Sequence, residues 1–302
     1  MNKERPVLVI KLGALGDFVQ ALGPFNAIRK HHASRQIVLL TTPPFVSMAE
    51  ASGYFDDIHA GIRPAWWQLK AILALRRWLH DLNPERVYDL QTSDRSNAYF
   101  KLFGSPRPEW SGIAASCSHP HANPQRDGMH TIERQAEQLA MAGVEVKTDF
   151  DRNWLNADIR HFKLAKRYVL LVPGGAPHRP FKRWPHYRSL ATRLVKRGIT
   201  PVILGTWAER DVIDDIFGAC PEAVDLSDKT SLLEIAGLSR KAVAAIGNDT
   251  GPMHLIATTG CRSIVLYSSA SNPTLCAQRG PHVQIIRKDQ LADIEVEEVE
   301  GE

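Results

Sequence analysis

The residues best suited to chemistry stand in the segment Gly247-Asn-Asp-Thr-Gly-Pro-Met-His254. An apolar run ends at Ile246, so a strand leads into a loop, and Pro252 suits the first turn of a helix because the amide that it lacks would be unpaired there. Helix-start amides and the helix dipole bind phosphate without a lysine. Because Asp249 and Thr250 directly precede this helix start, the pattern predicts a nucleotide or sugar-nucleotide diphosphate site. The alternative is that Asp249 or Thr250 only caps the helix.

A second candidate lies near the N-terminus, in Lys11-Leu-Gly-Ala-Leu-Gly-Asp17. Gly13 and Gly16 allow a tight turn and a close approach of a ligand to the backbone. The GxxG spacing is not the GxGxxG of dinucleotide-binding folds, and no acidic residue ends the second strand to bind a ribose. Asp17 falls where a helix begins. It is either a first-turn carboxylate favoured by the helix dipole or a base that removes a proton from an acceptor hydroxyl.

Cations gather in a third segment, Pro173-Gly-Gly-Ala-Pro-His-Arg-Pro-Phe-Lys-Arg-Trp-Pro185. A loop at the carboxyl end of a strand that carries Arg179, Lys182 and Arg183 could neutralise a diphosphate leaving group. The alternative is a solvated basic loop, which is the usual role of a run of charges. Because the Trp-Pro pair attaches this loop to a helix start, we single out Lys182.

Short apolar runs alternate with longer amphipathic segments, which is the pattern of parallel α/β folds. In the first half we expect strands at 7–11, 36–42, 57–60 and 86–91, helices at 18–31, 45–53, 66–80, 97–103 and 131–142, and a loop at 106–127. In the second half we expect strands at 168–172, 201–204, 223–226, up to 246, and 263–267, and helices at 184–197, 208–217, 231–238 and from 251. The acidic tail from 289 is expected to be a short final helix or a frayed end.

A polar stretch without periodicity, 146–166, separates the two series. We therefore expect two Rossmann-like domains, at 1–155 and 156–302. Ligands of parallel α/β domains bind at the carboxyl ends of the strands. The two parallel sheets are accordingly expected to face each other across a cleft, with the early glycine turn opposite the late motif.

The composition excludes several classes of protein. The net charge of +4 does not indicate a nucleic-acid partner, no apolar stretch approaches membrane-spanning length, and the N-terminus lacks a signal-peptide pattern, so a cytoplasmic location is expected. Reduced, mostly buried thiols are expected at Cys117, Cys220, Cys261 and Cys276, which are widely spaced and form no CxxC pair. Surface positions, and no metal site, are expected for the irregularly spaced His119, His121 and His130.

Three segments together resemble one known family. LGALGD at 12–17, KRWP at 182–185 and GNDTGPMHLIA at 247–257 resemble family 9 glycosyltransferases, the group of the lipopolysaccharide heptosyltransferases. The resemblance implies a GT-B fold, in which the first domain mainly holds the acceptor and the second holds the nucleotide sugar. It implies inverting, metal-independent transfer of a sugar, typically heptose from ADP-heptose, to a lipopolysaccharide-core or related glycan acceptor.

The family pattern also implies roles for single residues. Asp17 matches the general base, Lys182 the cation at the donor phosphates, and Asp249 the carboxylate near the donor sugar. The other residues assigned to the donor are Gly13, Thr250, Gly251, Pro252, His254 and Ser231, and those assigned to the acceptor are Arg63 and Arg95. The implied partners are a nucleotide-sugar donor and a glycolipid or oligosaccharide acceptor. No metal, cofactor or nucleic acid is implied.

The chain also departs from the family pattern. Pro177 and His178 stand where small hydroxyl residues are common, and 268–273 (SSASNP) replaces a loop of the type GPTDP. These departures leave open a catalytically altered protein that binds a nucleotide sugar, or another GT-B enzyme such as an epimerase. A metal-dependent GT-A enzyme would use an Asp-x-Asp pair. Asp149 and Asp151 have this spacing, but they do not follow an apolar strand.

The segment 66–80 combines tryptophans with cations on an amphipathic helix. Packing of its apolar face in the core is expected, since aromatic stripes at helical spacing are usually core. The alternative is that Arg63, Lys70, Arg76 or Arg77 meets an anionic glycolipid acceptor or the inner surface of the cytoplasmic membrane.

Overall fold

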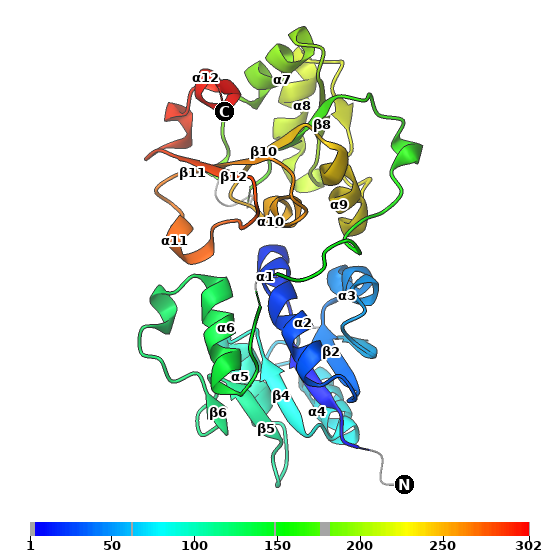
Figure 1. The fold of residues 1–302 in the computed structure, drawn as a ribbon, viewed down its shortest axis with the longest axis vertical. Helices are drawn as coiled ribbons and strands as arrows, with labels where there is room; N and C mark the ends of the chain where they lie inside the picture. The colour runs from blue at the N-terminus through cyan, green and yellow to red at the C-terminus, as the bar shows by residue number, and fades with distance from the viewer. Residues whose placement is uncertain (1–3, 62, 148, 176–181, 302) are drawn as a thin grey trace. The chain divides into compact units, whose positions relative to one another are not determined.

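The computed structural model describes residues 4–61, 63–147, 149–175 and 182–301 (Figure 1). The chain forms two compact units, Met1–Asp151 and Arg152–Glu302. In the described residues, each unit contains one six-stranded sheet in which the strands pair in parallel. The strand orders are β3-β2-β1-β4-β5-β6 and β12-β11-β10-β7-β8-β9. Counted from the start of each unit, both are the doubly wound order of Rossmann-like domains.

The N-terminal unit alternates strands and helices, from the blue β1 to the green α6 in Figure 1. Its strands are β1 (Val7–Ile10), β2 (Ile37–Thr41), β3 (Asp57–Ala60), β4 (Arg86–Asp89), β5 (Glu109–Gly112) and β6 (His119–Pro120). Its helices are α1 (Leu15–Gln20), α2 (Leu22–His31), α3 (Val46–Ser52), α4 (Leu69–Leu82), α5 (Asp94–Phe100) and α6 (Thr131–Met141).

The C-terminal unit repeats this alternation. Its strands are β7 (Tyr168–Val172), β8 (Thr200–Ile203), β9 (Val224–Asp225), β10 (Ala244–Asn248), β11 (Ser263–Tyr267) and β12 (Val283–Arg287). Its helices are α7 (Tyr187–Lys196), α8 (Arg210–Ala219), α9 (Leu232–Lys241), α10 (Gly251–Thr258), α11 (Pro273–Cys276) and α12 (Val296–Gly301).

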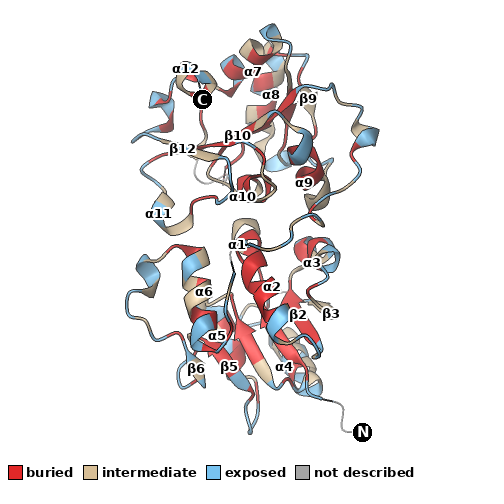
Figure 2. Ribbon diagram, viewed as in Figure 1, coloured by how far each residue is buried: buried red, intermediate tan, exposed pale blue. Residues whose placement is uncertain are grey.

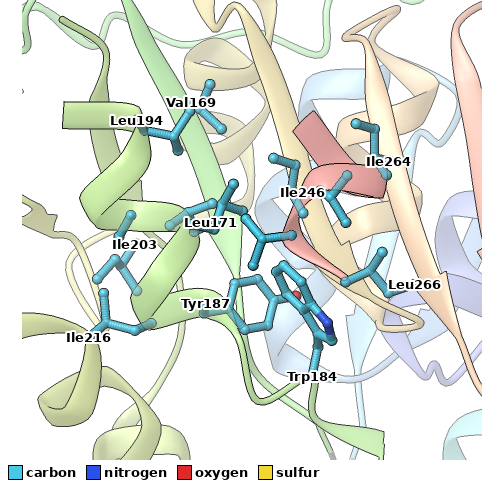
Figure 3. Packing of buried hydrophobic residues seen from close by; sticks show 14 of the residues in the cluster. Val169, Leu171, Trp184, Tyr187, Leu194, Ile203, Ile216, Ile246, Ile264 and Leu266 are labelled. Carbon is cyan, nitrogen blue, oxygen red and sulfur yellow. The ribbon is translucent and has the colours of Figure 1, made fainter. Parts of the chain in front are cut away.

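Strands β1, β2, β7 and β11 are buried along their whole length, and Figure 2 shows buried residues in red. Helices cover both faces of such a parallel sheet, so its strands consist of nearly continuous apolar residues. In the C-terminal core the ring of Trp184 packs at 5.0 Å, centroid to centroid, against that of Tyr187, beside Leu171 and Ile246 (Figure 3). Trp184 Nε1 also donates to the carbonyl of Ile294 at 2.8 Å, which attaches the C-terminal segment to the same core.

Several element boundaries differ from the sequence-based expectations. The helix expected at 18–31 begins at Leu15 and divides at Ala21. The segment expected as a loop contains the short strands β5 and β6, and β12 was not expected at all. Residues 119–120 form a strand only because they pair with β5, and no local propensity marks such a contact. The acidic tail does end in a short helix, α12.

The expectation for the histidines is wrong at two of three positions. His121 is buried and its Nε2 lies 2.9 Å from Glu137 Oε2. His130 is also buried, and its Nδ1 accepts the backbone amide of Ile132 at the start of α6. His119 is partly exposed. The polar partners are what make burial of these rings tolerable.

The expectation for the cysteines is confirmed, since all four thiols are free and only Cys276 is partly exposed. The described residues contain no cluster of three or more His, Cys, Asp or Glu side chains suited to a metal ion. No helix in the described parts of the chain has the length and apolar character needed to cross a bilayer. The expectation that α4 packs in the core is confirmed only for part of the helix, because Leu79 is its one buried residue.

Replacing Gly247 tests how tightly the C-terminal core packs beneath the late motif. A Cβ there would lie 2.6 Å from Met253 Sδ and 2.8 Å from Val172 Cβ, so Gly247→Ala should lower the free energy of unfolding. Overpacking of this kind costs about 1–3 kcal/mol. The control is Gly218→Ala in α8, where a Cβ would meet nothing within 4 Å. This substitution should raise the free energy of unfolding by about 0.5–1 kcal/mol, because alanine favours a helix over glycine. Urea unfolding of both variants is the measurement, and equal effects would contradict the packing.

Candidate functional site

The late motif places Asp249 directly after β10, at the carboxyl edge of the C-terminal sheet. Its Oδ2 lies 3.8 Å from Lys182 Nζ, and both side chains are less than one fifth exposed. Lys182 also donates to Ser271 Oγ. The structure thus brings together two residues that the sequence singled out in separate segments, and adds a hydroxyl from the segment at 268–273.

Two buried residues that sequence reasoning missed hold the Asp249 carboxylate. Gln278 Nε2 donates to Asp249 Oδ1 at 3.1 Å. The Tyr267 hydroxyl lies 3.0 Å from the same oxygen and 2.8 Å from Gln278 Oε1, so its single proton can serve one acceptor at a time. Burial and the neighbouring Asp249 raise the pKa of Tyr267 well above its usual value, so the phenol stays a neutral donor. Tyr267 could have been suspected as the last residue of a predicted strand, whereas nothing in the sequence marks Gln278.

Asn248 attaches the basic loop to the motif, and it too was missed. This residue is 1 % exposed. Its Nδ2 donates to the carbonyls of Pro173 (2.9 Å) and Gly174 (3.0 Å), where the loop leaves β7. Its Oδ1 accepts the amide of Trp184 (3.2 Å) and the hydroxyl of Tyr187 (3.2 Å), where the loop ends. One side chain therefore fixes both ends of the loop that carries Lys182.

The cations of the basic loop have different surroundings. Arg179 lies outside the described residues, as do Pro177 and His178. The guanidinium of Arg183 binds the Asp211 carboxylate at 3.0 Å and also donates to backbone carbonyls, which is a structural role. Lys182 is the described loop cation that lies beside Asp249.

The N-terminus of α10 is not closed by a side-chain cap. Thr250 occupies the N-cap position, but its side chain makes no hydrogen bond to a helix amide, and Pro252 lies in the first turn. Within the described residues, Thr250 Oγ1 is buried and has no partner. A buried hydroxyl without a partner costs free energy that an anionic oxygen could recover. Together with Gly251 and the buried His254, the helix start and Lys182 form a candidate site for a diphosphate.

Ser231 stands apart from this group. It is the N-cap of α9, where its Oγ accepts the Glu234 amide at 3.3 Å and its own backbone amide donates to Glu234 Oε2 at 2.7 Å. This reciprocal arrangement is a capping box. Among the described contacts, no hydrogen bond or ion pair joins Ser231 to Lys182 or Asp249.

In the N-terminal unit the glycine turn is sterically demanding at Gly13. Its φ of +104° disfavours other residues, and a Cβ would lie 2.5 Å from the Phe45 ring and 2.8 Å from Arg63 Nη2. Asp17 follows in the first turn of α1, partly exposed, and its Oδ2 accepts the Ala14 amide at 3.2 Å. This contact is the first-turn role that the sequence allowed, and it leaves the other carboxylate oxygen available to a substrate proton.

The two arginines assigned to the acceptor lie close to this turn. Arg63 Nη2 donates to the carbonyl of Leu12. Arg95, on α5, donates through Nη1 to the carbonyl of Pro64 at 2.5 Å. The loop that contains Arg63 is therefore held between the glycine turn and α5.

A pair of buried charged residues lies near Asp17 and was also missed. Lys11 is 3 % exposed, and burial lowers its pKa to about 8 against the opposing effect of Asp17 and Asp89. Asp89, fully buried at the end of β4, has a pKa raised by burial to about 6, although two loop amides donate to its Oδ1.

Comparison with known proteins identifies the family of this chain. Residues 72–300 match the family described as glycosyltransferase family 9 (heptosyltransferase). The chain is 34% identical over 115 residues to lipooligosaccharide heptosyltransferase 2 of Haemophilus influenzae, an alignment that spans 36% of this chain and only 33% of that relative. It is 20% identical over 283 residues to the lipopolysaccharide core heptosyltransferase OpsX of the same organism, spanning 87% of this chain and 79% of that protein.

Solved structures show the same fold. A family 9 glycosyl transferase from Veillonella parvula superimposes with a TM-score of 0.80 at 17% identity, covering 95% of this chain and 87% of that one. The E. coli heptosyltransferase WaaC, solved with ADP, gives 0.78 at 19% identity and covers 98% of each chain. E. coli ADP-heptose lps heptosyltransferase II gives 0.76 at 19% identity, covering 97% of this chain and 96% of the other. The predicted α/β fold of the GT-B class is confirmed.

Replacement of Lys182 tests the diphosphate site. At a diphosphate site, Lys182→Gln should weaken the binding of a nucleoside diphosphate by on the order of tenfold to a hundredfold, because it removes one charge-assisted contact worth about 1.5–3 kcal/mol. The matched control is Arg183→Gln, which removes the adjacent cation, bound instead to Asp211. Isothermal titration calorimetry of both variants measures the difference. Equal affinities would show that Lys182 does not contact the diphosphate.

Proposed function

Because this chain belongs to glycosyltransferase family 9, we propose that it transfers a sugar from a nucleotide-sugar donor to a lipopolysaccharide-core or related glycan acceptor. The proposed donor is ADP-heptose, the nucleotide sugar after which E. coli heptosyltransferase II, a protein of the same fold, is named. We propose a cytoplasmic location and a single, inverting displacement that needs neither a metal ion nor a cofactor. The observation that carries this function is the Lys182–Asp249 pair beside the open N-terminus of α10.

The C-terminal unit supplies the donor chemistry in this proposal. As the bond between the sugar and the diphosphate breaks, negative charge grows on the leaving nucleoside diphosphate. Lys182, the Thr250 hydroxyl and the amides of the first turn of α10 stabilise that charge. Donors fixed in advance act most strongly on charge that develops in the transition state. Asp249, held by Gln278, would bind hydroxyls of the donor sugar.

The N-terminal unit supplies the base. The acceptor hydroxyl oxygen attacks the anomeric carbon from the face opposite the diphosphate, its proton passes to Asp17, and the nucleoside diphosphate leaves. In this proposal the Asp17 carboxylate, in the first turn of α1, is the general base that accepts this proton. Arg63 and Arg95 are proposed to contact the acceptor.

The departure from the family pattern at 268–273 supports activity rather than its loss. Ser271 accepts a hydrogen bond from Lys182, so this segment still supplies a polar group beside the proposed phosphate cation. A protein that only binds a nucleotide sugar would not require a base in the other unit. Transfer to an acceptor distinguishes the two.

Transfer by the purified full chain is the direct test of the proposed function. With ADP-heptose and a lipopolysaccharide-core acceptor we expect transfer to continue in EDTA, with nuclear magnetic resonance showing inversion at the anomeric carbon. Nucleotide binding without transfer to any acceptor would support the binding-protein alternative. Transfer that EDTA abolishes and Mg²⁺ restores would contradict the metal-independent mechanism.

The Asp17→Asn variant tests the base. Turnover should fall by on the order of a hundredfold or more, because the amide cannot accept the acceptor proton, while ADP affinity should remain. The matched control is Asp94→Asn, which changes an exposed first-turn carboxylate in the same unit. Asp17→Asn and Asp94→Asn each remove a carboxylate charge from the first turn of a helix. A lower turnover of Asp17→Asn than of Asp94→Asn is therefore assigned to the lost base. Wild-type turnover in Asp17→Asn would remove Asp17 from the mechanism.

A further inference from the structure

An exposed apolar surface lies on residues that the proposed reaction does not use. Its exposed fractions are 79 % at Trp66, 67 % at Trp67, 68 % at Leu69 and 60 % at Leu73, and these four residues are called the tryptophan patch below. They fall within eight consecutive positions, yet they are half of the large hydrophobic side chains that are exposed in the described residues. Such clustering on a protein surface marks an interaction site, whereas scattered exposed side chains do not.

The patch is not the core-facing side of α4. Leu79 is buried, and the other contacts of this helix with the N-terminal core come from partly buried residues, Leu75, Trp78 and Leu82. Leu69 and Leu73 are one turn apart and lie on the opposite side of the helix by its 3.6-residue period. The helix therefore has one apolar strip for the core and a second that faces away from it.

The charges around the patch have one sign. Between Asp57 and Asp81 the chain contains no acidic residue, but it contains four cations: Arg63, Lys70, Arg76 and Arg77. All four are exposed. Lys70 and Arg77 lie three and four positions from Leu73, so they border the outer apolar strip. Two tryptophans in the turn before α4, followed by outward-facing leucines and cations on the helix, are typical of segments that lie in a membrane interface.

We infer that the tryptophan patch and its bordering cations dock onto a bilayer that carries anionic headgroups. This inference rests on the proposed function and names the partner of its acceptor side. The loop that precedes the tryptophan patch also contacts the proposed acceptor side. Arg63 donates to the Leu12 carbonyl beside the glycine turn, and the Pro64 carbonyl accepts from Arg95. Docking would thus hold the turn that leads to Asp17 next to the headgroup layer.

A second copy of the chain fits this surface less well. A symmetric dimer places the same patch on both sides, so the cations of one copy would meet those of the other. Like charges in contact oppose association, whereas anionic headgroups attract each Lys or Arg near the surface. Charge complementarity therefore favours the bilayer.

Co-sedimentation of the full chain with vesicles tests the inference, using phosphatidylcholine alone or mixed with phosphatidylglycerol and no glycolipid acceptor. The wild type should sediment with the anionic vesicles. Trp66→Ser/Trp67→Ser should lower its partition coefficient by on the order of tenfold or more, through lost apolar burial. Lys70→Gln/Arg76→Gln/Arg77→Gln should lower it by on the order of a hundredfold on anionic vesicles only. The matched control is Trp207→Ser, a 75 % exposed tryptophan beside Arg210 in the other unit, which should bind as the wild type does.

Each outcome separates the inference from the proposed function. Loss of vesicle binding by the double tryptophan variant, with unchanged transfer to a soluble deacylated acceptor, supports the inference. Wild-type vesicle binding by that variant overturns it and leaves the transferase intact. A wild-type dimer in sedimentation velocity that the variant dissociates would make the patch an interface between copies, and would also overturn it. Vesicle binding by a chain that transfers no sugar would overturn the proposed function instead.

Discussion

The four hydrogen bonds of Asn248 are the constraint on which the proposed donor site depends. Its amide satisfies the carbonyls of Pro173 and Gly174 and accepts the amide of Trp184 and a phenol, all in a buried setting. Strands β7 and β10 are parallel neighbours, so both loops leave the same edge of the sheet. Removing a partner from any of these buried groups would cost about 1–3 kcal/mol per group. The position of Lys182, two residues before Trp184, follows from that attachment.

The two units share one strand order but carry side chains of opposite charge at the carboxyl edges of their sheets. The carboxyl edge of the C-terminal sheet offers an ammonium, a hydroxyl and a helix start, which suit an anion. The carboxyl edge of the N-terminal sheet offers the partly exposed Asp17 carboxylate, which suits the proposed proton transfer. Because strand order fixes only where loops emerge, the chemistry depends on the side chains at those loops.

The apolar runs of the sequence predicted most of the strands, and the family resemblance assigned both Lys182 and Asp249 to the donor. The sequence could not predict Gln278, which follows a segment without periodicity and reaches Asp249 from 29 positions away. Nor could it predict the burial of His121, which depends on the contact between its ring and the Glu137 carboxylate. For α4, periodicity identified which residues share a face. It could not say whether a second element covers that face, and none buries Leu69 or Leu73.

The geometry around Lys182 is compatible with the proposed diphosphate, although the lysine already has partners inside the site. At 3.8 Å from Asp249 Oδ2 the ammonium lies near the outer limit of an ion pair, and its other described partner, Ser271, is a neutral hydroxyl. Asp249 in turn is held by Gln278 and does not depend on the lysine for its position. A phosphate oxygen could therefore approach Lys182 without the loss of a tight salt bridge. The loose pair keeps the cation in place while leaving most of its charge available to the ligand.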